Sequence, residues 1–143
     1  MPTRTLIAVV LIAAFARIDL LAQQAAAPPV FLDKSPKVVA FQLKRLTNPQ
    51  LLAVERKTDH AKYIPVYDAI LVRKGIERKF RQEAAEGLAT LNKSDAVVEI
   101  LNGIGKADKD DAGTQADLVG LLLTQKPAAL AGQKEKIAAL AAE

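Results

Sequence analysis

The chain has 143 residues, of which 50% are hydrophobic and only 4% aromatic, and its formal net charge is +4. It contains no cysteine, which excludes disulfides, thiolate metal sites, cysteine nucleophiles and Cys-x-x-Cys-His attachment of c-type haem. This length fits one domain, the composition predicts a core of close-packed helices, and the basic balance weakly favours anionic partners.

The N-terminal residues have the pattern of a targeting segment. Arg4 precedes an uninterrupted apolar run over residues 6–16, which is shorter than the roughly 20 residues that span a bilayer. Small residues allow cleavage after Ala16 or after Ala27. We therefore predict that residues 1–27 are a secretory signal peptide and that the chain is exported, to the periplasm or outside the cell. The alternative is a buried or membrane-associated N-terminal helix, and an uncleaved segment would be the chain's one membrane contact.

Proline marks the next boundaries. Residues 28–35 are predicted to be an extended linker, since they begin with two prolines. Ser35-Pro36 predicts a helix start, and Asn48-Pro49 repeats the device with Asn48 as the cap. Residues 56–62 are polar and predicted to be a loop. The inner faces of the two helices are Val39, Leu43 and Leu46, and then Leu51, Leu52 and Val54.

Three helices are predicted in the centre of the chain. The first opens at Pro65 and ends at Gly75, a residue suited to a left-handed C-cap. The second covers about residues 77–92. The third covers about residues 95–104, with Ser94 as its N-cap, and is ended by glycines. Apolar residues at helical spacing give the inner faces: Val66, Ala69 and Ile70; Phe80, Ala84, Leu88 and Leu91; Val97, Ile100, Leu101 and Ile104. The glycines that end the third are Gly103 and Gly105.

The C-terminal part follows a charged loop over residues 106–113. A helix from about Thr114 carries a broad apolar face, and Pro127 opens the last helix. This last helix has no closing glycine cap, so we expect its apolar residues to be partly exposed or covered by a partner. They form a possible apolar end surface of Leu130, Ile137 and Leu140. No segment shows sustained β alternation, so the predicted fold is all-α with six or seven short helices.

A faint internal period of about 30 residues connects these helices. Each period is a helix, a loop and a second helix, and such a unit must stack on its neighbours to bury its apolar face. The pattern predicts an α-solenoid. The matching positions are Ile70-Leu71 with Ile100-Leu101, Gly75 with Gly105, Leu88 with Leu118, and Leu91 with Leu121.

The central stretch resembles a HEAT-type repeat. The resemblance is carried by Arg81-x-x-Ala84-Ala85-x-x-Leu88-x-x-Leu91, followed by Asp95-Ala96-Val97-Val98-x-Ile100-Leu101. Residues 37–106 are also similar to helical segments near the start of large exported bacterial proteins, many of which carry a c-type cytochrome module. The resemblance implies a HEAT-like repeat domain over residues 36–143 that acts as a scaffold. Haem activity is not implied, because Cys-x-x-Cys-His is missing, and we expect no cofactor.

The densest charge feature is a basic cluster opposed only by Glu77. As a binding site it would recognise an anionic protein, polysaccharide or lipid headgroup. Nucleic acid is not expected, because no aromatic stacking platform accompanies the cations. The alternative is a solvated corner between helices, in which one arginine pairs with Asp68 or Asp95. The cluster consists of Arg73, Lys74, Arg78, Lys79 and Arg81, and Arg81 is the arginine that would pair.

Three other patterns do not predict a site. Residues 108–113 begin like a calcium loop, but Ala112 and Val119 occupy positions that need oxygen ligands. His60 is the sole histidine, so no second nitrogen or sulfur ligand completes a metal site. The neighbouring carboxylates Glu83 and Glu86 are interpreted as a solvated helix face. We therefore expect no metal site and no catalytic residues.

The sequence favours a non-enzymatic exported helical-repeat scaffold or protein-interaction module. One alternative is an accessory segment of an exported redox enzyme, of the cytochrome c-associated kind, or of an exported hydrolytic enzyme. Another is a small periplasmic helical bundle that binds an anionic ligand. The scaffold interpretation implies a protein partner.

Overall fold

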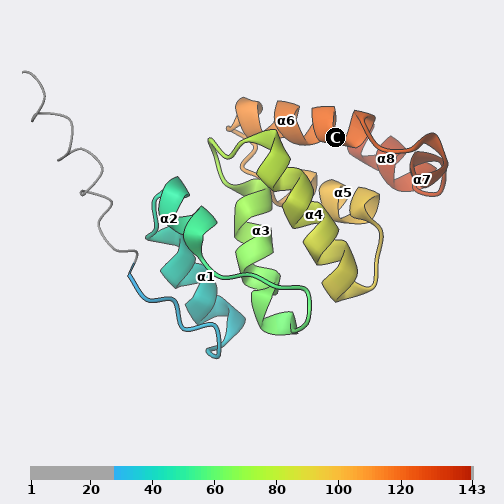
Figure 1. The fold of residues 1–143 in the computed structure, drawn as a ribbon. Coiled ribbons are helices and arrows are strands. Elements are labelled where there is room, and N and C mark those ends of the chain that lie inside the picture. The colour runs from blue at the N-terminus through green and yellow to red at the C-terminus, as the bar shows by residue number, and fades with distance from the viewer. Residues whose placement is uncertain (1–27, 143) are drawn as a thin grey trace, which may run out of the picture.

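The computed structural model describes residues 28–142, and helices are the only regular secondary structure within that range (Figure 1). The all-α prediction is therefore confirmed, whereas the predicted signal peptide over residues 1–27 lies outside the described residues. The described part holds eight α-helices rather than six or seven, and one short 3-10 helix. They are α1 (Pro36–Lys44), α2 (Asn48–Ala53), η1 (Ala61–Tyr63), α3 (Ile64–Val72), α4 (Arg78–Asn92), α5 (Ala96–Lys106), α6 (Ala112–Leu123), α7 (Pro127–Ala131) and α8 (Lys134–Ala141).

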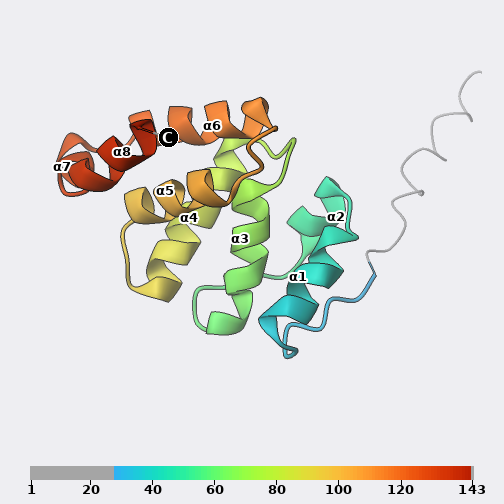
Figure 2. The same cartoon turned by 180° about the vertical axis from the view of Figure 1, so that it is seen from behind.

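Helix α3 lies at the centre of the fold. It packs against α1 and α2 on one side and against α4 and α5 on the other, as both views show (Figures 1 and 2). Helix α6 packs against α4 and α5, and α8 packs against α5. The segment α7–α8 lies at the far end of the molecule from α1 and α2.

The core follows the apolar spacing of the central helices. Ala84 and Ala85 of α4 are 0% and 1% exposed, as expected where neighbouring helices approach closely. Gly87 lies one turn further on, against the ring of Tyr67 from α3. Every helix from α1 to α6 contributes at least one fully buried side chain, among them Leu43, Leu51, Ile70, Leu88, Ile100 and Leu118.

Two helix starts differ from prediction by one residue. Helix α2 is capped by Thr47, whose hydroxyl accepts from the Gln50 amide in a capping box, and not by Asn48. Helix α5 is capped by Asp95, whose carboxylate accepts from the Val97 amide at 2.7 Å. In α2 the cap is Thr47, the earlier of the two candidates, and in α5 it is the acidic Asp95. Each of these side chains reaches the free amides of the first turn.

Ser94, the predicted cap of α5, has another role. Its hydroxyl donates to the carboxylate of Glu99, which also accepts from the Asn92 amide at 3.1 Å. Glu99 is only 4% exposed, so these two bonds satisfy a buried carboxylate at the α4–α5 turn.

The predicted helix ends at glycine are wrong. Gly75 has the expected left-handed φ of +75°, but α3 already ends at Val72, so this glycine turns the α3–α4 loop. Gly103 and Gly105 lie inside α5, which continues to Lys106. Gly103 is buried against Leu71, which explains the small residue without a helix break.

The C-terminal boundaries also shift. Helix α6 begins at Ala112, because Asp111 caps it through the Thr114 amide at 3.2 Å. The predicted last helix is divided into α7 and α8 around Gly132 and Gln133. This division accounts for one of the additional helices.

Candidate functional site

The structure does not present the predicted basic cluster as one surface, because Arg81 lies in the interior. Arg81 is 0% exposed, and burial lowers the pKa of its guanidinium. The guanidinium donates to the carbonyls of Leu71 and Ile76 at 2.5 and 3.1 Å, and to the hydroxyl of Thr114 at 3.2 Å. A fourth bond goes to the carbonyl of Arg73 at 2.9 Å. The prediction that Arg81 belongs to a surface cluster is wrong, because its hydrogen-bond donors are used inside the fold.

The carboxylate nearest Arg81 is neither of the two suggested by the sequence. Asp117 lies 3.9 Å from its Nε, whereas Asp68 pairs with Lys106 and Asp95 caps α5. Asp117 comes from α6, so Arg81 braces the α3–α4 loop against both α4 and α6.

The other members of the basic cluster are dispersed. Arg73 donates to the carbonyls of Leu43, in the last turn of α1, and of Leu46, just after that helix, at 2.6 Å each. Arg78 pairs with Asp117 at 3.5 Å. The two lysines, Lys74 and Lys79, are exposed, and Lys79 pairs with Glu77 at 2.8 Å and lies over the Phe80 ring.

The predicted apolar end surface is half-buried. Leu130, Ile137 and Leu140 pack against the core, which agrees with the expectation of partial exposure. Leu140 also lines a cavity of about 420 Å³ between α5 and α8. The most exposed large apolar side chain in the described range is instead Leu123, at 74%.

The sites rejected from the sequence have structural roles. The Nδ1 atom of His60 accepts from the Lys62 amide at 3.0 Å and so caps η1. Glu83 pairs with Arg56, at 2.7 Å to its Nε and 3.2 Å to its Nη2. Within residues 28–142, no cluster of three or more histidine or carboxylate side chains is placed to hold a metal ion.

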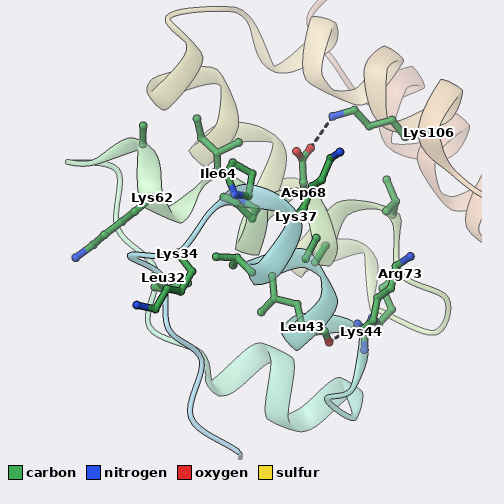
Figure 3. Close-up of a pocket in the computed structure, with 17 residues that line it drawn as sticks. Leu32, Lys34, Lys37, Leu43, Lys44, Lys62, Ile64, Asp68, Arg73 and Lys106 are labelled. Carbon is green, nitrogen blue, oxygen red and sulfur yellow. Dashed lines mark hydrogen bonds and ion pairs between the residues drawn. The ribbon is translucent and has the colours of Figure 1, made fainter.

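A groove between α1 and α3 forms a cavity with a volume of about 760 Å³ (Figure 3). Its walls come from α1, α3, the 28–35 segment and η1, and Lys106 at the end of α5 closes one side. We call it the α1–α3 groove. Its apolar lining consists of Leu32, Pro36, Val39, Ala40, Leu43, Ala61, Ile64, Pro65, Ala69 and Val72.

Cations dominate the polar lining of the α1–α3 groove. Six basic side chains and one carboxylate line it, so its local formal charge is +5. The carboxylate is Asp68, which Lys106 pairs at 2.9 Å, as the dashed line in Figure 3 shows. The basic side chains are Lys34, Lys37, Lys44, Lys62, Arg73 and Lys106. An apolar cleft with a basic rim can bind a molecule that is both apolar and anionic.

Sequence reasoning missed this groove because its cations are dispersed along the chain. Only Lys37 and Lys44 lie on one element, seven residues apart and therefore on one face of α1. Of the predicted cluster, only Arg73 lines the groove. The i, i+7 lysines beside the buried Val39 and Leu43 were the one pattern that could have indicated it.

Comparison with known proteins adds no identity. No protein-family model, curated protein or solved structure matches this chain. Among the helices of residues 28–142, none combines the length and the hydropathy needed to span a membrane.

Proposed function

We propose that this chain is a non-enzymatic helical-repeat binding module and that the α1–α3 groove is its binding site. The observation that carries the proposal is the combination of an apolar lining with six basic side chains in a cavity of about 760 Å³. Small-molecule sites typically have volumes of about 300–1,000 Å³ and mostly apolar walls with a few polar groups. Arg81 of the predicted basic cluster, by contrast, is buried, and its donors are used inside the fold.

A HEAT-like arrangement is part of this proposal. Helices α3 and α4 would form one repeat and α5 and α6 the next, since α3 packs against α5 and α4 against α6. The positions that match at 30 residues support this pairing. Ile70 and Ile100 are buried in the first helices, and Leu88 and Leu118 in the second helices. In such a stack each repeat supplies one layer of a continuous core.

Export is the third part of the proposal. It is supported by the apolar run over residues 6–16 behind Arg4, which is the pattern of a cleaved signal. Intact mass measurement of the protein from the envelope fraction of the source cell tests it. A mass lacking residues 1–16 or 1–27 is expected. Full-length protein confined to the cytoplasmic fraction would contradict this part alone.

Binding in the groove is tested with a neutral apolar dye, Nile red, so that charge plays no part in the result. The full chain should increase the dye's fluorescence saturably, with one dye per chain. Ala40→Phe places a ring in the groove from an exposed position on α1 and should abolish that signal. Ala116→Phe, at an exposed position on α6, is the matched control and should bind the dye normally.

The two variants should melt within a few degrees of the wild type, since both positions are exposed. Equal dye binding by Ala40→Phe and Ala116→Phe would place the apolar site elsewhere. It would contradict the α1–α3 groove as the binding site.

A further inference from the structure

We propose that the α1–α3 groove binds a free single-chain amphiphile with an anionic headgroup. The apolar chain would lie between α1 and α3, and the headgroup would lie at the lysines of the rim. This inference rests on the proposed function, because it names the ligand class of the same groove.

The apolar lining supplies the first argument. Leu43 and Val39 are the buried floor on α1, and Ile64, Ala69 and Val72 line the facing side from α3, each half-buried. These are aliphatic side chains without hydrogen-bonding groups, so they favour a hydrocarbon over a sugar or a nucleotide. Each methylene that moves from water into such a site strengthens binding roughly fourfold. A chain of about ten carbons therefore has enough apolar surface for binding.

The rim supplies the second argument, through charge complementarity. Three of its six cations are already used: Arg73 donates to backbone carbonyls, Lys106 pairs with Asp68, and Lys34 pairs with its neighbour Asp33 at 3.4 Å. Lys37 and Lys44 are exposed, and neither forms an ion pair with any part of the chain that the structure describes. They lie two turns apart on the α1 wall, so they can approach a headgroup at either end of the groove. An anion is attracted there and a cation is repelled.

Other anionic occupants fit less well. Nucleic acid needs aromatic faces on which bases can stack, and no aromatic side chain lines the α1–α3 groove. Phe31 and Phe41 are exposed but do not belong to its lining. An acidic peptide helix typically buries its apolar side chains in a long groove. The α1–α3 groove, by contrast, has the volume of a small-ligand site and is bounded by Lys106 on one side. A single hydrocarbon chain with one acidic head satisfies both the lining and the rim.

The test is competition for bound Nile red in the full chain, at low salt and below micelle-forming concentrations. The probes are dodecanoate, dodecyl phosphate and dodecyltrimethylammonium, which share a chain length and differ in headgroup. Both anions should displace the dye at concentrations about tenfold lower than the cation. Preference between the two anions identifies the headgroup, and displacement by either one supports the inference.

A double variant tests the rim. Lys37→Gln with Lys44→Gln should weaken dodecanoate binding by about 5- to 30-fold, as expected for two lost charge contacts, and should affect binding of the neutral Nile red far less. Lys109→Gln with Lys134→Gln removes two exposed lysines that do not line the groove and is the matched control. Raising the salt concentration should weaken the anions and not the dye.

Each contrary outcome has a separate meaning. Equal displacement by anions and cation overturns the anionic ligand and leaves the binding site standing. Loss of Nile red binding itself overturns the proposed function as well. Tighter competition by an acidic amphipathic peptide, or binding only to anionic vesicles, would assign the groove to a protein or a bilayer. Nile red binding by the variant Val10→Asp, whose apolar run is interrupted by a charge, but not by the wild type would assign the groove to the chain's own residues 6–16. Each of these three assignments overturns the inference.

Discussion

The guanidinium of Arg81 and the hydroxyl of Thr114 lie 3.2 Å apart, although 33 positions separate the two residues in the chain. The same guanidinium donates to the carbonyls of Leu71, in the last turn of α3, and of Arg73 and Ile76, in the α3–α4 loop. One fully buried side chain of α4 therefore connects that loop with α6. A buried charge is tolerated here because hydrogen bonds occupy its donors.

Replacement of Arg81 by methionine should lower the free energy of unfolding by about 3–5 kcal/mol, because the loop carbonyls lose their donors in the interior. Arg81→Lys should lower it nearly as much, since one ammonium cannot reproduce a fork of guanidinium donors. Urea unfolding measures both. Arg78→Met, three residues earlier, is the control. Arg78 is 52% exposed and pairs only with Asp117, so its loss should cost less than about 1 kcal/mol. Equal losses at the two arginines would refute the bracing role.

Local pattern was sufficient for the central helices and insufficient for Arg81. The residues Phe80, Ala84 and Leu88 repeat at helical spacing, and that face is buried as the spacing predicts. Arg81 follows Arg78 and Lys79, so the sequence placed it with exposed neighbours. Its burial depends on carbonyls of the α3–α4 loop and on Thr114 of α6. Only the tertiary fold brings those groups together.

The α1–α3 groove could not be predicted from the sequence for the same reason. Lys62 and Lys106 come from separate elements and join Lys37 and Lys44 only after α1 and α5 have packed around α3. The helix ends at glycine were predicted wrongly for a different reason. Gly103 was interpreted as a stop, but its missing side chain makes room for Leu71, a packing demand that a single sequence does not reveal.

The contact between Gly87 and Tyr67 gives a prediction with an internal control. A Cβ atom at position 87 would lie 2.6 Å from the Tyr67 ring, and that ring is only 4% exposed. Gly87→Ala should therefore destabilise the fold by about 1–3 kcal/mol through overpacking, despite the better helix propensity of alanine. Gly105→Ala, where a Cβ would meet nothing within 4 Å, should stabilise by about 0.5–1 kcal/mol. Thermal melts of the two variants should move in opposite directions, and parallel shifts would contradict the packing described.

The face of α4 that carries Leu88 can be probed from both directions. Leu88 is 1% exposed, so Leu88→Ala should cost about 2–5 kcal/mol by leaving a cavity. Ala84 is 0% exposed, so Ala84→Leu should cost about 1–3 kcal/mol by overpacking. Leu123→Ala, at 74% exposure, is the control and should change stability by less than about 0.5 kcal/mol. Urea midpoints for Leu88→Ala and Ala84→Leu that equal that of the wild type would remove this face from the core.

Asp111 should make α6 sensitive to acid. Its carboxylate accepts from the hydroxyl of Thr114 at 2.6 Å and from the Thr114 amide at 3.2 Å, and these bonds hold its pKa below the ordinary value of 3.8. Since the folded pKa is the lower one, the unfolded chain binds the proton first. The stabilisation is therefore present above pH 3.8 and is lost as the pH falls through the folded pKa.

Asp111→Asn keeps an N-cap acceptor and removes the titration. The variant should lose less stability than the wild type between about pH 6 and pH 3, as measured by urea midpoints at each pH. Asp110→Asn controls for the loss of one exposed carboxylate from the same loop. If the urea midpoint of Asp111→Asn changed with pH as that of the wild type does, the Thr114 bonds would not favour the ionised form of Asp111.

Asp68 provides the sharpest prediction for the α1–α3 groove, since it is the one carboxylate among the residues that line it. It pairs with Lys106 at 2.9 Å, so it both repels an anionic headgroup and occupies a cation that could bind one. Asp68→Asn removes the repulsion and releases Lys106, and it should tighten dodecanoate binding about two- to fivefold, the range of a partly exposed charge pair. Nile red binding should stay the same, because the apolar walls do not change. Glu86→Gln removes an exposed carboxylate of α4 that does not line the groove and should leave both affinities unchanged. Weaker dodecanoate binding in Asp68→Asn would mean that Asp68 holds Lys106 in place for the ligand rather than competing with it.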